Sequence, residues 1–151
     1  MSFFSVAFGA RAHVVPFIVR VGLGLLFLAA GVLKLRYTAA LAATIAGLHL
    51  GLPGPLVAAI AVALPPFEIL LGIYLITGLL PFVAATTAAA LLFVFIIVLS
   101  SAVLRGLTAP CGCFGPGDTG PTTWLTVARD GIAIVPAIYL MWWLKQQSPR
   151  G

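Results

Sequence analysis

The sequence predicts an all-α integral membrane protein, a bundle of four transmembrane helices with both termini on the same side. The chain of 151 residues is 62% hydrophobic and only 7% charged, whereas a soluble domain carries about 25% charged residues. Four of its segments are apolar over the roughly 20 residues that a spanning helix needs. An even number of spans returns the chain to its starting side, and one domain, 1–151, is expected at this length.

The first predicted span covers residues 16–36, and Pro16 is suited to its first turn because proline is tolerated there. Its apolar run is longer than the core of a signal peptide, so we expect the segment to be retained. The second span covers 55–78 and the third 81–104. Because the connection between these two is a tight turn, they are expected to be antiparallel neighbours.

The fourth predicted span covers residues 122–145, with Thr122 or Thr123 as its N-cap. Between the first two spans, the apolar stretch at 37–47 predicts a short interfacial or re-entrant helix. The third loop, 105–121, is too rich in glycine and proline to be helical.

That third loop contains the only two cysteines of the chain, Cys111 and Cys113, on either side of Gly112. Residues two apart lie roughly 5.5–7 Å from each other, and a disulfide needs about 4.4–6.8 Å between its alpha carbons. The freedom of glycine lets such a pair close into a strained bridge of the labile type. As a structural bridge it would add only about 1.5 kcal/mol. We therefore favour a redox pair over a structural disulfide, two inert thiols or a Cu(I) site, and predict no resident metal.

A redox pair has consequences for orientation. Disulfides persist outside the cytosol, so the loop with the cysteines is predicted on the periplasmic or extracellular face and the termini in the cytoplasm. The basic residues near the span ends divide equally between the two sides and do not settle the orientation by themselves. Because these residues are scattered, the net charge of +5 indicates membrane-interface residues and no nucleic-acid surface.

Apart from Arg36 and Lys145 at the span ends, five charged residues fall within the predicted spans. A charge at the centre of a span costs roughly 2.5–3.5 kcal/mol, so these residues should face the bundle interior and pair. We expect Glu68 to reach Arg20 or Arg129, and Asp130 to reach Lys34. They are interpreted as structural links between helices, with a proton relay for thiol oxidation as the functional alternative.

Two loop residues lie on the predicted side of the cysteines. His49 is interpreted as an interfacial histidine, with a proton carrier as the alternative. Arg105 could favour the thiolate form of one cysteine. In the first span, Gly22, Gly24 and Gly31 allow close helix packing, within one bundle or between copies.

Four stretches carry a recognisable pattern, in chain order. Residues 20–35 read RVGLGLLFLAAGVLKL, residues 66–78 read PFEILLGIYLITG, residues 111–115 read CGCFG after an Arg-Gly pair, and residues 128–130 read ARD. Together they resemble the MauE branch of the DoxX-like membrane proteins, over nearly the whole chain. The resemblance implies a four-helix bundle in the bacterial inner membrane that takes part in thiol-disulfide chemistry, with Cys111 and Cys113 as the redox pair.

The resemblance also implies partners. The methylamine-utilisation member of the family is linked to maturation of methylamine dehydrogenase, a periplasmic enzyme rich in disulfides, alongside a thioredoxin-like protein. The pair would then exchange a disulfide with a thioredoxin-like periplasmic protein or with a disulfide-containing client. The architecture is also similar to quinone-linked thiol oxidoreductases of the DsbB and vitamin K epoxide reductase type, which suggests a quinone cofactor, although the chain lacks their Cys-x-x-Cys motif and second cysteine pair. The alternatives are a non-catalytic membrane scaffold for a redox enzyme and a Cu(I)-handling protein.

Overall fold

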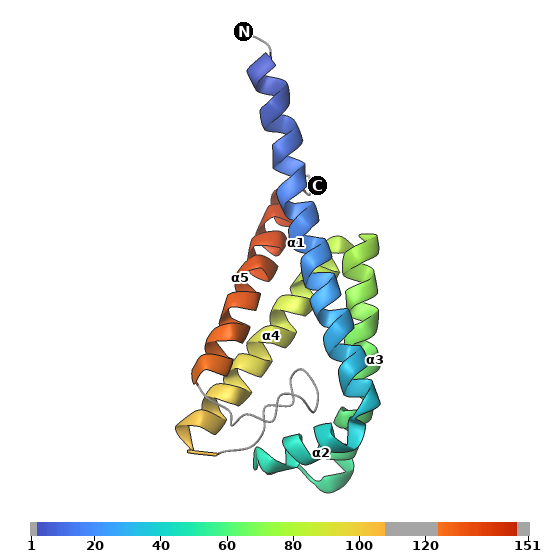
Figure 1. Ribbon diagram of the computed structural model, residues 1–151, viewed down its shortest axis with the longest axis vertical. Coiled ribbons are helices and arrows are strands. Elements are labelled where there is room, and N and C mark those ends of the chain that lie inside the picture. The colour runs from blue at the N-terminus through green and yellow to red at the C-terminus, as the bar shows by residue number, and fades with distance from the viewer. Residues whose placement is uncertain (1–2, 108–123, 148–151) are drawn as a thin grey trace.

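The computed structural model describes residues 3–107 and 124–147, and in these ranges all regular structure is helical. The elements follow in the order α1 (Phe3–Arg36), α2 (Thr38–Gly47), α3 (Gly54–Thr77), α4 (Pro81–Leu104) and α5 (Trp124–Gln147) (Figure 1). The predicted all-α class is confirmed. Among the described helices, three contain segments long and apolar enough to cross a membrane, namely Val14–Arg36, α3 and α4. The fourth predicted span corresponds to α5, which is not in this group.

The described helix boundaries agree with the prediction to within two residues, except at the beginning of the chain; the N-cap predicted at Thr122 or Thr123 lies outside the described residues. α3 and α4 begin and end within one residue of their predicted limits, and α2 occupies the short apolar stretch of the first loop. α1 begins at Phe3, so Pro16 lies inside the helix and not in its first turn. The sequence before Pro16 is mostly Phe, Val and Ala, which continues the helix upstream. Pro65 and Pro66 likewise lie inside α3, as transmembrane helices tolerate.

α1 packs along α3 at a distance that only glycine permits. A Cβ atom on Gly24 would lie 2.9 Å from the Gly72 carbonyl oxygen, and one on Gly31 would lie 2.8 Å from that of Pro65. The obstacles are backbone atoms, which cannot rotate away. Gly24 and Gly31 therefore pack helices within the bundle, as small residues do in membranes, whereas Gly22 has no neighbour within 4 Å of such an atom.

The helices form two pairs, α1 with α3 and α4 with α5. The pairs are joined at the tight turn between α3 and α4, which we call the turn end, and they diverge towards α2, at what we call the α2 end (Figure 1). Around the turn end, leucine and alanine side chains form the core, including Leu23, Leu75, Ala85, Ala88 and Leu140. The core therefore fills one half of the bundle, and the diverging half is arranged differently.

The outward faces of the long helices are apolar. Ile18, Val62, Phe93 and Ile132, one on each long helix, are all more than half exposed. Apolar side chains on every outer face match a lipid environment, in which helices satisfy their own backbone hydrogen bonds. The chain is therefore a helical membrane protein.

Candidate functional site

A buried ion pair links α1 to α3 in the diverging half of the bundle. The Lys34 Nζ atom lies 2.5 Å from Oε1 of Glu68, and the two side chains are 5% and 1% exposed. Gly31 lies three residues before Lys34 and Pro65 three residues before Glu68, and the backbones of α1 and α3 are in contact there. Because the helices approach so closely, the lysine stem reaches the carboxylate directly. The other oxygen, Glu68 Oε2, is buried without a hydrogen-bond partner among the described residues.

This pairing corrects the sequence-based prediction. Glu68 was expected to reach Arg20 or Arg129, and Asp130 to reach Lys34, but Glu68 pairs with Lys34. The reason is helix packing: α1 lies along α3, and Arg20 lies about 20 Å from Lys34 along the axis of α1, at 1.5 Å per residue. Asp130 is buried on α5. The side chain of Arg129 lies outside the described part of the structure.

Arg20 lies at the turn end instead. Its guanidinium group lies against Gly78, and its central carbon is 5.5 Å from the centre of the Phe17 ring. Gly78 ends α3 with a left-handed φ of 74°. The carbonyl end of a helix carries a partial negative charge, which a cation there stabilises. Arg20 therefore has a place at the end of α3 and no contact with the buried pair.

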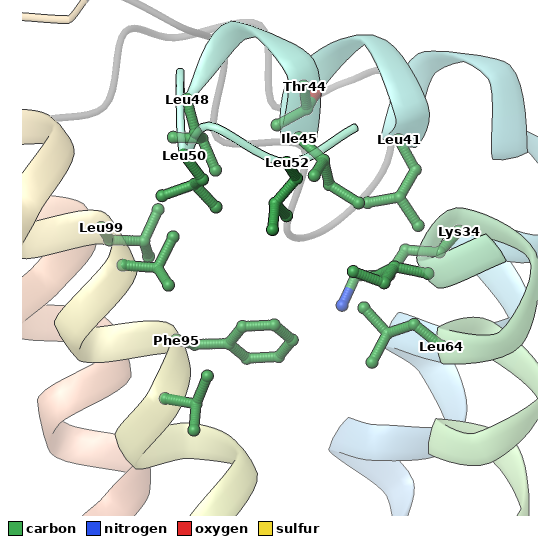
Figure 2. Close-up of a pocket in the computed structure, with 13 residues that line it drawn as sticks. Lys34, Leu41, Thr44, Ile45, Leu48, Leu50, Leu52, Leu64, Phe95 and Leu99 are labelled. Carbon is green, nitrogen blue, oxygen red and sulfur yellow. The ribbon is translucent and has the colours of Figure 1, made fainter. Parts of the chain in front are cut away.

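An apolar cavity of about 230 Å³ lies next to the ion pair, between α3 and α4, with α2 across its end. Figure 2 shows the Lys34 nitrogen pointing into this cavity, towards the ring of Phe95 on α4. The nitrogen lies 4.8 Å from the centre of that ring, close enough for a cation–π interaction. Most other lining residues are aliphatic, among them Leu41, Leu48, Leu64 and Leu99.

At the α2 end, Arg105 fixes the start of the third loop. It follows the last residue of α4, and its guanidinium group donates hydrogen bonds to the backbone oxygens of Leu48 (2.9 Å), His49 (3.1 Å) and Ser101 (3.0 Å). Leu48 and His49 follow α2, whose carbonyl end attracts cations. The start of the third loop thus lies against the end of α2, an adjacency that the sequence analysis expected. The His49 side chain is exposed, with Nδ1 2.7 Å from the Gly47 oxygen.

The two cysteines and the rest of residues 108–123 lie outside the described residues. The roles assigned to Cys111 and Cys113 therefore stay predictions, as do those of His49 and Arg105 in proton transfer and thiol activation. Arg105 is six residues before Cys111 in the chain.

Sequence reasoning missed two contributors to this region. Phe95 lies in a continuous apolar run, and nothing in that run separates it from neighbouring lipid-facing residues. Gly72, where α3 approaches Gly24 of α1, did leave a signal, because small residues are enriched where membrane helices pack closely.

Comparison with known proteins places these residues in a family context. A family model described as "Methylamine utilisation protein MauE" matches residues 12–143. The methylamine utilization protein MauE of Paracoccus denitrificans is 38% identical over 112 residues, which cover 74% of this chain and 60% of that protein. This chain therefore matches about 60% of the length of that curated relative. No solved structure matches the chain. The range matched by the family model includes Lys34, Glu68, Arg105 and both cysteines.

Proposed function

Because this chain belongs to the MauE family, we propose that it acts in methylamine utilisation as a membrane thiol-disulfide redox protein. The observation that carries the proposal is the spacing of Cys111 and Cys113, the only cysteines of the chain, within the family match. With only Gly112 between them, they can close into a strained, labile bridge suited to exchange. The wider grouping with DoxX-like proteins stays a prediction.

The exchange conserves atoms and electrons. A thiolate of a dithiol client attacks one sulfur of the Cys111–Cys113 bridge and forms a mixed disulfide. The second client thiolate breaks that bond, so the client leaves oxidised and both cysteines are left as thiols. The reverse sequence reduces a client disulfide. The partner is a thioredoxin-like periplasmic protein or a disulfide-containing enzyme such as methylamine dehydrogenase.

The proposed topology makes α5 the fourth span. It has 24 residues, like α3 and α4, and packs along α4. Its polar residues lower its hydropathy, but Asp130 is buried within the bundle. Pro16 and Phe17 of α1 share a pocket with Trp143 of α5, which supports two termini on one side. In this topology the turn end faces the cytoplasm of a bacterial inner membrane, and the α2 end faces the periplasm.

The hydrogen bonds of Arg105 support this assignment by giving the loop with the cysteines a fixed base beside α2. Arg105 is the nearest cation before the cysteines in the chain and favours their thiolate form. The exposed His49 lies at the same base and accepts protons that the thiols release.

The redox state of the cysteines in intact cells tests the proposal. Cells are quenched with acid, and thiols are labelled with a membrane-impermeant reagent before and after reduction and across a series of thiol buffers. We expect a readily reduced bridge that is labelled from outside. Thiols that never oxidise, or a bridge that resists all reductants, would contradict the redox assignment.

Genetic complementation separates chemistry from scaffolding. In a strain that lacks the gene, Cys111→Ser and Cys113→Ser should fail to restore growth on methylamine, whereas the matched loop variant Thr119→Ser should restore it. Normal growth with either cysteine variant would assign the chain a non-catalytic scaffold role instead.

A further inference from the structure

The cavity beside Lys34 has the size of one substituted ring. Its volume is about 230 Å³. An apolar cavity of about 150 Å³ accommodates benzene, whereas drug-sized ligands occupy about 300–1,000 Å³. The space therefore suits a six-membered ring with small substituents.

The polarity of the cavity selects a neutral ligand. Lys34 is the basic side chain among the described lining residues, and the hydroxyl of Thr44 already donates to the Ala40 oxygen at 3.0 Å. An ammonium group has three donors, and Glu68 accepts the one hydrogen bond described for it. A carbonyl oxygen in the cavity can accept another. Because Glu68 already balances the lysine charge, a carboxylate or phosphate would add an uncompensated buried charge, which is costly.

Two further features of the cavity fit a flat ring that carries an apolar tail. Phe95 presents its ring to the cavity opposite Lys34 (Figure 2), and aromatic rings favour offset stacking with another flat ring. At the edge of the cavity, Leu50, Leu52 and Val94 are exposed apolar side chains. They provide a path by which an apolar tail can pass from the cavity to the bilayer.

We propose that this cavity binds the ring of an isoprenoid quinone, with Lys34 Nζ donating a hydrogen bond to a ring carbonyl and Phe95 stacking on the ring. Glu68 is a positioning residue, because it holds the ammonium group in place. A quinone takes up two electrons and two protons, the same numbers that a dithiol releases when it becomes a disulfide. The role of the quinone as an electron acceptor depends on the proposed thiol-disulfide exchange, whereas its binding to the cavity does not require the cysteines.

Photoaffinity labelling tests this site. The full-length protein, purified in lipid nanodiscs, is irradiated with a short-tailed azido-ubiquinone, and the labelled peptides are identified by mass spectrometry. We expect labelling of the cavity segments of α2 and α4, and competition by unlabelled short-tailed ubiquinone. Val98→Trp fills the cavity and should lower labelling at least tenfold. Ile97→Trp makes the same change at the neighbouring, outward-facing position of α4 and should leave labelling unchanged.

Further variants make the result independent of one substitution. Leu64→Phe fills the cavity from α3 and should also lower labelling, so a folding defect of Val98→Trp does not decide the outcome. Lys34→Met combined with Glu68→Met removes the donor without leaving a lone charge, and should weaken quinone binding about tenfold, as expected for a lost hydrogen bond.

The outcomes distinguish the quinone site from the proposed thiol-disulfide exchange. Labelling that both cavity-filling variants leave unchanged, or that oleate displaces as well as ubiquinone does, would overturn the site. A variant with both cysteines changed to serine should bind quinone normally. If the quinone binds and the cysteines never cycle in cells, the quinone site stands and the thiol exchange fails. If the cysteines cycle but quinone labels nothing, the thiol exchange stands and the quinone site fails.

Discussion

Lys34 Nζ and Glu68 Oε1 lie 2.5 Å apart, and this contact joins the last turn of α1 to the middle of α3 with both charges almost completely buried. Desolvating two ions costs several kcal/mol for each, so a buried pair adds little net stability over apolar residues of similar size. Removing one partner is different, because the remaining charge is then buried without compensation.

Changing one partner should therefore do more damage than changing both. We expect Lys34→Met to destabilise the protein by about 3–5 kcal/mol, and the double variant Lys34→Met/Glu68→Met to recover most of that loss. Reversible unfolding in mixed detergent micelles, followed by circular dichroism, measures the free energy of unfolding. If the single and double variants lose the same free energy of unfolding, the charges of Lys34 and Glu68 do not compensate each other.

The glycine contact between α1 and α3 gives a second prediction. A Cβ atom on Gly24 would meet backbone atoms of α3, so Gly24→Val should lower the free energy of unfolding by about 1–3 kcal/mol, as overpacking does. Gly22→Val is the matched control two residues earlier, where such an atom has open space. We expect the control to unfold like the original chain in the same detergent assay. Two variants of equal stability would mean that the close approach of the helices does not contribute.

Gly78 and Gly51 provide a matched pair in the left-handed region, with φ values of 74° and 70°. An alanine in this region costs roughly 1–2 kcal/mol at either position. At Gly78 the new methyl group would also displace the guanidinium group of Arg20 from the end of α3, whereas at Gly51 it would meet nothing within 4 Å. Gly78→Ala should therefore have the lower melting temperature of the two. The opposite order would contradict the location of Arg20 at the end of α3.

Arg105 should control the mobility of the segment that follows α2. Arg105→Ala loses the hydrogen bonds to the Leu48 and His49 oxygens and should raise amide hydrogen exchange in residues 48–53 by about five- to tenfold. Arg105→Lys keeps the positive charge but loses the planar guanidinium group that donates to both oxygens. It should therefore raise the hydrogen exchange almost as much. Arg36→Ala, which removes an exposed cation at the end of α1, is the control. Unchanged exchange in Arg105→Ala would show that other contacts fix this segment.

Local signals predicted most of the secondary structure. Pro81 and the turn before it marked the boundary between α3 and α4 to within a residue, because proline and glycine restrict the backbone by themselves. The start of α1 was missed because Pro16, a good first-turn residue, is equally tolerated inside a membrane helix. The four-span count rests on α5 and stays a prediction.

The candidate site was less accessible from sequence, because it depends on which helices meet. Lys34 and Glu68 were both singled out, but their pairing follows from the contact of Gly31 with Pro65, which no local pattern specifies. Phe95 and the cavity depend on the divergence of the two helix pairs. Cys111 and Cys113 show the opposite case, since their spacing is itself the signal.

The pairing of α1 with α3 also affects how the protein is made. Both helices, their glycine contacts and both members of the ion pair lie within the first 77 residues. Synthesis proceeds from the N-terminus at about 5–20 residues per second, so this half of the bundle can assemble before synthesis of the whole chain is complete. The lysine and the glutamate can then neutralise each other as this half of the chain enters the bilayer.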